Sequence, residues 1–322
     1  MTTLSVSTYC IREHLGPMVF DVTDPAGNDV HFELPYEKLL DLSDFPQRAR
    51  ETFGVDAIET VATQFAGLDD PELDRFASAL ESADVRLVNV AIDAGDLLGS
   101  DPEKRAADID LNKQWIDRFA AMGSAFVRVN PGSPFTPHTG QVPPAYLVDA
   151  LIELGDHAIR RGTRLLVENH GGPGSDPVWM NNLLDGVGYD RLGLLLDLGN
   201  FDVLLQPVLA TAFAGITGVA PEADFATMVD SLDLTPLYDG IDALAGRAEL
   251  VHVKVNEVDE TGETRAVDLT RAFGILHRHG YEGPLTVEYE GTGGDPWWKT
   301  GRIVDITRGY ESSPATAHES RR

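Results

Sequence analysis

The chain has 322 residues, of which 43% are hydrophobic and 24% charged, an ordinary globular composition that excludes extensive disorder. The formal net charge is −27 at pH 7, from 52 acidic and 25 basic residues. Because nucleic acids and anionic lipids attract basic surfaces, this charge argues against both as partners. Two interpretations of the charge stay open: an acidic soluble protein, or adaptation to high salt, where counterions screen repulsion among carboxylates.

Cysteine usage and the first residues bear on the compartment. Cys10 is the single cysteine, so an internal disulfide and a cysteine-based zinc site are excluded. The first residues lack the basic and apolar regions of a secretion signal, and no run of about 18 uncharged apolar residues occurs. We therefore expect a cytoplasmic protein without a membrane segment.

Short apolar runs alternate with longer amphipathic stretches, a pattern typical of parallel strands connected by helices. Eight strands are predicted, at Leu4–Ile11, Val55–Val61, Val85–Ile92, Ala125–Asn130, Arg164–Glu168, Leu192–Asp197, Leu250–Val255 and Leu285–Tyr289. Helices are predicted at Tyr36–Thr52, Pro71–Ala83, Pro102–Met122, Pro143–Arg161, Pro177–Gly186, Pro236–Ala245, Leu269–His279 and Pro296–Arg308. Eight βα units in succession predict an α/β fold, a closed (β/α)8 TIM barrel in one domain over residues 1–311.

Two segments depart from the regular βα repeat. Residues 201–235, after the sixth strand, are far longer than a usual βα loop and leave the barrel on the side where active sites lie. Their apolar sequence VLLQPVLATAFAGI predicts either a lid over the mouth or a contact within a homo-oligomer. Residues 312–322, SSPATAHESRR, are polar without periodicity and predict a disordered tail.

The ends of the last four predicted strands carry the candidate functional residues. In this fold, polar side chains at the carboxyl ends of strands face the active-site mouth, and apolar ones fill the interior. The polar residues are Glu168, Asn169 and His170 after the fifth strand, Asp197 and Asn200 after the sixth, His252 and Lys254 on the seventh, and Glu288 and Glu290 on the eighth. The period of two in a strand puts the members of the last two pairs on one face.

A single such acid is as readily explained by a helix cap or a surface ion pair. Here, however, four consecutive strands each supply an acid or a His from an otherwise apolar run, and buried charges are costly unless they are paired or bind metal. Glu168, Asp197, His252 and Glu288 form an oxygen-rich ligand set that suits Mn²⁺ or Mg²⁺, with Co²⁺ or Zn²⁺ as alternatives. The sequence therefore predicts a site for one divalent metal ion.

These motifs resemble those of the xylose-isomerase-like TIM barrels, which include sugar-phosphate isomerases and epimerases, keto-sugar 3-epimerases, inosose dehydratases and endonuclease-IV-type repair enzymes. The resemblance covers residues 4–310 and depends on VENHGG at 167–172, LDLGNF at 196–201, VHVK at 251–254 and VEYEG at 287–291. It implies that Glu168, Asp197, His252 and Glu288 hold the metal. Weaker similarities, in IETV, NVAIDAGDL and VRVNPG, imply that further residues face the mouth: Glu59, Asn89, Asp93, Arg128 and Asn130.

The resemblance implies a metal-dependent isomerase or epimerase that transfers a proton beside the carbonyl of a small sugar, keto-sugar, polyol or sugar phosphate. Keto-sugar 3-epimerases carry a His three residues after the sixth-strand Asp and an acid three residues after the seventh-strand His. Asn200 and Val255 stand at these positions, so the resemblance does not extend to that activity in particular. The alternatives are a dehydratase or lyase, DNA repair of the endonuclease-IV type, which the charge disfavours, and a non-catalytic, metal-stabilised binding protein.

Glu168 and Glu288 are the predicted catalytic carboxylates, because strands five and eight let them approach a substrate from opposite faces. Lys254 is expected either to stabilise a developing oxyanion or to pair with a neighbouring acid. We expect the substrate to contact a wider set of polar residues: Glu59, Arg128, Asn169, His170, Asn200, Lys254 and Glu290.

Overall fold

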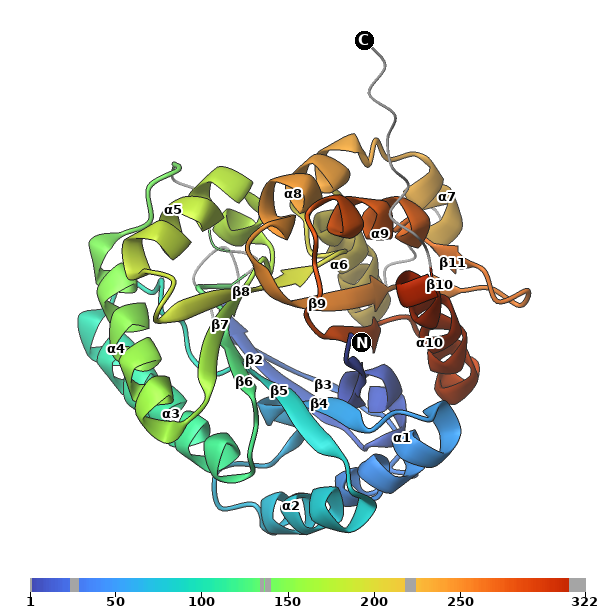
Figure 1. Cartoon of the computed structure of the whole chain (residues 1–322), viewed down its shortest axis with the longest axis horizontal. Coiled ribbons are helices and arrows are strands. Elements are labelled where there is room, and N and C mark those ends of the chain that lie inside the picture. Colours follow the sequence, from blue (N-terminus) through green and yellow to red (C-terminus); the bar gives the residue numbers. More distant parts are fainter. Residues whose placement is uncertain (1, 24–28, 134–135, 137–139, 218–223, 313–322) are drawn as a thin grey trace.

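Eight parallel strands form a closed barrel in the computed structural model, which describes residues 2–23, 29–133, 136, 140–217 and 224–312 (Figure 1). Around the barrel the strand order is β1-β12-β9-β8-β7-β6-β5-β4. The strands are β1 (Leu4–Ser7), β4 (Ala57–Val61), β5 (Arg86–Ile92), β6 (Phe126–Val129), β7 (Arg164–Glu168), β8 (Leu192–Asp197), β9 (Ala248–Val255) and β12 (Leu285–Tyr289). The predicted (β/α)8 class and its eight strands are confirmed.

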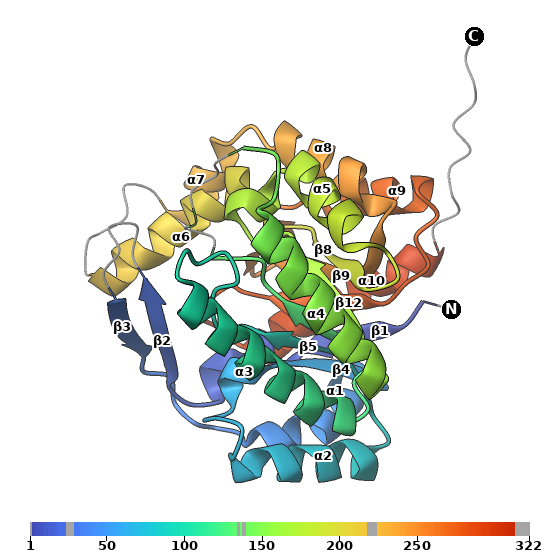
Figure 2. The same ribbon diagram turned by 90° about the vertical axis from the view of Figure 1, so that its left-hand side faces the viewer.

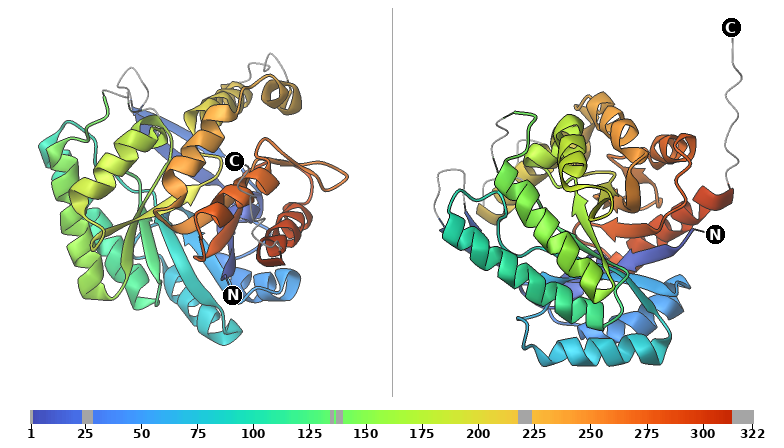
Figure 3. Two further views of the ribbon diagram at one scale, coloured as in Figure 1. Left: turned by 45° about the horizontal axis from the view of Figure 1, so that its top comes forward. Right: turned by 60° about the vertical axis from the view of Figure 1, so that its left-hand side comes forward.

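Helices form a layer outside the strands (Figures 1 and 3). They are α1 (Phe45–Phe53), α2 (Pro71–Ala83), α3 (Pro102–Ala121), α4 (Ala145–Arg161), α5 (Pro177–Val187), α8 (Thr235–Ala245), α9 (Leu269–Arg278) and α10 (Pro296–Ser312). Proline opens α2, α3 and α5, where its fixed φ and missing N–H suit the first turn. Among the described residues, no helix is long and apolar enough to cross a membrane.

The predicted strand Leu4–Ile11 was drawn too long at its end, and the predicted helix Tyr36–Thr52 was placed too early at its start. The strand stops at Ser7, whose hydroxyl accepts a hydrogen bond of 3.2 Å from the Tyr9 N–H and so starts the 3-10 helix η1 (Thr8–His14). The helix begins at Phe45, and farther upstream the N–H groups of Leu39 and Leu40 both donate to the His14 carbonyl of η1. Three further 3-10 turns are η2 (Leu42–Asp44), η3 (Ala62–Gln64) and η4 (Gly172–Ser175).

Additional elements stand at the carboxyl end of the barrel. β2 (Met18–Thr23) and β3 (Asp29–Leu34) form an antiparallel hairpin that the sequence analysis did not predict. The long segment after β8 contains α6 (Asp202–Thr217) and α7 (Phe225–Asp230), whereas residues 218–223 lie outside the described residues. Figure 2 shows the hairpin and α6 at the end opposite the N-terminus, where the barrel strands end.

These elements leave two predictions open. The lid or oligomer contact proposed for residues 201–235 stays a prediction. Of the predicted tail, Ser312 ends α10 and residues 313–322 lie outside the described residues.

A two-stranded hairpin, β10 (Glu257–Val258) with β11 (Thr264–Arg265), follows β9.

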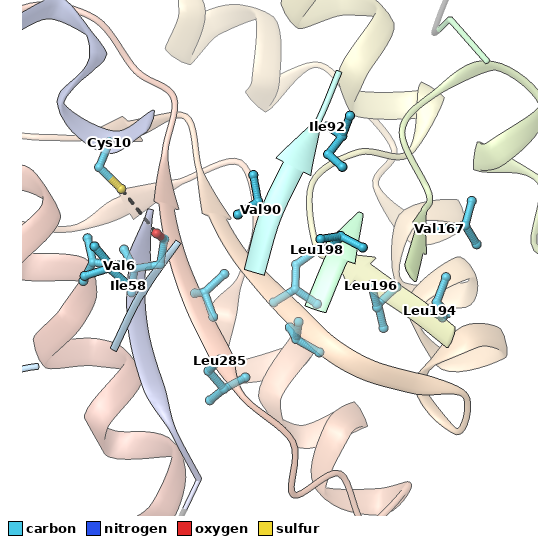
Figure 4. Close-up of a cluster of buried hydrophobic side chains, with 14 of the residues drawn as sticks. Val6, Cys10, Ile58, Val90, Ile92, Val167, Leu194, Leu196, Leu198 and Leu285 are labelled. Atoms are coloured by element: carbon cyan, nitrogen blue, oxygen red, sulfur yellow. Dashed lines mark hydrogen bonds between the residues drawn. The ribbon is translucent and has the colours of Figure 1, made fainter. Parts of the chain in front are cut away.

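Buried apolar side chains line both faces of the barrel strands. The outward ones, among them Val6, Ile58 and Leu196, belong to one large core beneath the helices (Figure 4). The inward ones form a separate small cluster of Ala57, Val88, Leu166, Leu195 and Leu250, with Phe126 packed against it. Because side chains alternate along a strand, most of this cluster lies one step below the polar residues that end the same strands. It forms a packed floor under the mouth.

A matched pair of leucines tests this floor. Leu195 is fully buried in it, whereas Leu39 is 57% exposed. We expect Leu195→Ala to lower the free energy of unfolding by about 2–5 kcal/mol, because the structure around the cavity relaxes only partly. Leu39→Ala should change it by less than about 0.5 kcal/mol. Denaturant unfolding followed by circular dichroism measures both values, and similar losses would contradict a packed floor.

Candidate active site

The strand register brings the predicted ligands together at the carboxyl end of the barrel. Asp197 of β8 lies in register with His252 of β9, and Glu288 of β12 lies in register with Lys254 of β9. Glu168 ends β7, the strand on the other side of β8. All five residues are buried. The ends of four neighbouring strands thus build one buried cluster of charged groups.

His252 lies between carboxylates on both sides of its ring. Nε2 donates to Glu59, at 2.9 and 3.0 Å from the two carboxylate oxygens. Nδ1 lies 3.4 Å from Glu288 Oε2 and 3.5 Å from Asp197 Oδ2. Burial by itself lowers the pKa of His252, but the Glu59 and Glu288 carboxylates raise the pKa well above its usual value. Glu59 therefore holds the ring so that Nδ1 faces the acids at the mouth.

Lys254 brings its ammonium group into the same cluster. Nζ lies 3.0 Å from Glu290 Oε1 and 3.3 Å from both Asp197 Oδ2 and Glu288 Oε2. Burial lowers the pKa of Lys254, but these carboxylates raise it well above its usual value. Burial by itself would raise the pKa of Glu288. The charges of Lys254 and His252 nevertheless hold this pKa well below its usual value. The ammonium group is thus a counterion of the buried acids.

Glu168 is held by an amide on one oxygen and a guanidinium on the other. Asn200 Nδ2 donates to Glu168 Oε1 at 2.8 Å, and Arg128 Nε lies 2.8 Å from Oε2. Arg128 also pairs with Asp93, to which Asn130 Nδ2 donates at 2.7 Å. Burial raises the pKa of Asp93, but Arg128 more than offsets this and lowers it. One guanidinium therefore compensates two carboxylates.

Asp197 has one oxygen engaged by backbone and one directed to the cluster. Oδ1 accepts hydrogen bonds of 2.7 and 2.9 Å from the N–H groups of Gly199 and Asn200. The Asn169 side chain makes two hydrogen bonds to the backbone of Asp197: it accepts from the N–H at 2.7 Å and donates to the carbonyl at 2.9 Å. The structure thus places Asn169, a predicted substrate contact, in the link between β7 and β8.

Arg12 supports the site from η1 and was overlooked in the sequence. Its buried guanidinium donates to the carbonyls of Tyr289, Glu290 and Gly291 at 3.1, 2.7 and 2.9 Å. These bonds fix the chain directly after Glu288. No local motif marks Arg12, because its partners are 277 to 279 residues away in the sequence.

Two of the remaining candidates carry unsatisfied polar atoms. Both amide atoms of Asn89, which is in register with Glu59, and Nδ1 of His170 are buried without a hydrogen-bond partner among the described residues. A buried polar atom without a partner costs free energy, which a bound hydroxyl group or water recovers. These atoms are therefore suited to contact a polar substrate.

The cluster fits a divalent metal ion. Glu168, Asp197 and His252 offer ligand atoms within 4.8 Å of one another, as do Glu59, His252 and Glu288. Asp197 Oδ2 and His252 Nδ1 are buried and make no hydrogen bond within the described residues. Glu59 is engaged with Nε2 of the imidazole, on the side away from these atoms. Three carboxylates with one imidazole are a donor set that Mg²⁺ or Mn²⁺ accepts.

The chain belongs to the xylose isomerase-like TIM barrel family, whose sequence profile matches residues 46–306. An L-ribulose 3-epimerase has the same fold, with 16% identity, a TM-score of 0.63 and coverage of 97% of this chain and 95% of that one.

Two further solved structures share this barrel fold. A D-allulose 3-epimerase from Methylomonas sp., in complex with D-allulose, is 15% identical, with a TM-score of 0.62 and coverage of 96% and 97%. A xylose isomerase-like TIM barrel protein from Mycobacterium smegmatis, in complex with magnesium, is 16% identical, with a TM-score of 0.57 and coverage of 96% and 98%. No curated protein sequence matches the chain. At these identities the likeness establishes the fold alone.

The position of Lys254 generates a prediction about metal affinity. We expect Lys254→Met to bind Mn²⁺ about tenfold more tightly than the wild type, equivalent to about 1.4 kcal/mol, because the ammonium competes for Asp197 and Glu288. Isothermal titration calorimetry of metal-stripped protein measures the constant. Lys299→Met is the control, since Lys299 binds the Tyr289 hydroxyl outside the cluster, and should leave the affinity unchanged. Weaker binding by Lys254→Met would mean that the ammonium supports the metal.

Proposed function

We propose that this protein is a divalent-metal-dependent isomerase or epimerase that moves a proton on the carbon beside the carbonyl of a small sugar. The observation that carries the proposal is that buried Glu168, Asp197 and His252 offer ligand atoms within 4.8 Å of one another, with Glu288 Oε2 3.4 Å from His252 Nδ1. Membership of the family supports it. So do the names of two proteins with the same fold, an L-ribulose 3-epimerase and a D-allulose 3-epimerase.

The residues that would hold the metal are Glu168, Asp197, His252 and Glu288. A divalent ion at this site supplies positive charge that polarises the substrate carbonyl. The magnesium complex of the Mycobacterium smegmatis protein supports Mg²⁺ as one candidate, and the donor set favours Mn²⁺ equally.

Glu168 and Glu288 are the proposed proton-transfer groups. They end β7 and β12, which β8 and β9 separate around the barrel, so they reach a substrate from different sides. One carboxylate removes the proton beside the carbonyl. The other carboxylate first takes up a proton from solvent and then gives that proton to the opposite face of the same carbon in an epimerase, or to the neighbouring carbon in an isomerase. The low pKa of Glu288 keeps this carboxylate ionised before the reaction.

The other charged and polar residues orient these groups and the substrate. Lys254 places positive charge where negative charge develops on the substrate oxygen. Asn200 and Arg128 hold Glu168 in one orientation, so little reorganisation is needed during proton transfer. Asn89 offers an amide that both donates to and accepts from a sugar hydroxyl. Burial of the cluster strengthens each of these electrostatic interactions.

Metal content gives the first test of the proposal. Purified protein is expected to hold about one divalent ion per chain, and Asp197→Ala or His252→Ala should remove most of it, since each variant loses a ligand of four. The matched controls are Asp242→Ala and His279→Ala, from a surface pair 3.0 Å apart, which should retain the ion. Elemental analysis of the five proteins measures occupancy. Full occupancy in the Asp197 and His252 variants would show that the ligand set is different.

The fate of the substrate hydrogen tests the proton-transfer scheme. Turnover in deuterated water should place deuterium on the carbon beside the carbonyl, which NMR of the product detects. Glu168→Gln and Glu288→Gln should each lower kcat by roughly 10³-fold or more, because each removes a proton-transfer group. Glu81→Gln, on the exposed face of α2, is the control. Product without deuterium would refute the two-carboxylate scheme and indicate a direct hydrogen shift within the substrate.

A further inference from the structure

We propose that the substrate is an uncharged, unphosphorylated sugar or polyol and that the mouth of this barrel rejects sugar phosphates. The inference rests on the function proposed above and names its substrate class. Barrels of this kind bind phosphate through glycine-loop N–H groups, helix amino ends and cationic side chains at the mouth. In this chain, carboxylates of the protein already occupy many of these groups.

Three glycine-containing loops at the mouth direct a backbone N–H at a carboxylate. The bonds run from Gly172 to Asp202 Oδ1 (3.0 Å), from Gly199 to Asp197 Oδ1 (2.7 Å) and from Gly293 to Glu13 Oε2 (3.2 Å). They follow β7, β8 and β12 in turn. A phosphate needs such N–H groups as donors, and here each one already faces a negative charge.

The helix amino ends are occupied in the same way. In this fold the helices run back along the barrel, so their amino ends and positive dipoles lie on the mouth side. Five of them have a first-turn N–H bonded to an aspartate side chain: α2 to Asp70, α3 to Asp101, α5 to Asp176, α9 to Asp268 and α10 to Asp295. A phosphate approaching any of these ends meets a carboxylate in the position it would take.

The cations at the ends of the barrel strands are also paired with groups of the protein. Among the described barrel strands, Arg128 and Lys254 are the cations near the carboxyl ends, and both are paired with two or more carboxylates. Arg12 is held by three carbonyls after β12. The internal segments outside the described residues, 24–28, 134–135, 137–139 and 218–223, contain no Lys or Arg in their sequence. Among the described strand ends, a phosphate dianion would therefore find no side-chain cation that is not already paired with carboxylates.

The polar atoms that remain suit a neutral ligand. Asn89 has a buried donor and a buried acceptor, and His170 has a buried ring nitrogen, none with a hydrogen-bond partner among the described residues. Hydroxyl groups both donate and accept, so a polyhydroxy compound satisfies such atoms without bringing charge. The net charge of −27 opposes the approach of an anion as well.

Matched pairs of ketoses test the inference at constant ionic strength. The pairs are D-ribulose with D-ribulose 5-phosphate and D-fructose with D-fructose 6-phosphate, offered to the metal-loaded wild-type protein. We expect kcat/KM for a free sugar to exceed that for its phosphate by about 100-fold or more, a difference typical of a charged group left unpaired in a buried site. Phosphates that react as well as the free sugars would overturn this inference and leave the proposed function intact.

A variant that removes only the charge of a loop carboxylate tests whether these carboxylates cause the rejection of sugar phosphates. Glu13→Gln keeps an acceptor for the Gly293 N–H but removes the negative charge, so KM for the phosphate should fall about tenfold with little change for the free sugar. Glu81→Gln changes the net charge equally on the exposed face of α2 and should change neither value. Equal effects of both variants would overturn the assignment to the loop carboxylates. If neither member of any pair reacts, the proposed function fails, and this inference fails with it.

Discussion

Compensation of buried negative charge is the constraint on which this structure depends. An unpaired buried carboxylate costs several kcal/mol, so acids can end the barrel strands only where cations reach them. Three cations meet this need, and each contacts at least two carboxylates: His252, Lys254 and Arg128. Acids and cations come from different strands. Closure of the barrel is therefore what makes the charge cluster stable.

The same packing that closes the barrel also fixes the orientation of the charged groups. The apolar floor packs directly beneath the strand ends. Asn169 hydrogen-bonds to the backbone of β8, and Arg12 hydrogen-bonds to the backbone at the end of β12. Each carboxylate then has a defined partner on at least one oxygen. A site fixed in this way before a ligand arrives has little orientational entropy to lose during catalysis.

The sequence predicted the strands and the convergence of acids because both follow from local pattern: apolar runs that end in a polar residue. It did not predict which charges touch. The Glu59–His252 bond joins residues 193 positions apart and depends on barrel closure, and the same holds for Arg12. The β2–β3 hairpin did have a local signal, DPAGN between the alternating runs MVFDVT and DVHFEL. The predicted strand Leu4–Ile11 and helix Tyr36–Thr52 already complete one regular βα unit, and no strand was predicted between them.

The contacts of Lys254 connect stability with the proposed chemistry. The ammonium group of Lys254 and the ring of His252 compensate the acids Asp197 and Glu288 in the folded chain. A divalent ion held by Asp197 and Glu288, as proposed, would compete with the ammonium group for these acids. Glu290, the nearest carboxylate to Nζ at 3.0 Å, remains as a partner for the ammonium group. With those two acids bound to the proposed metal, the ammonium group would be free to face a substrate oxygen, so the role proposed for Lys254 depends on metal binding.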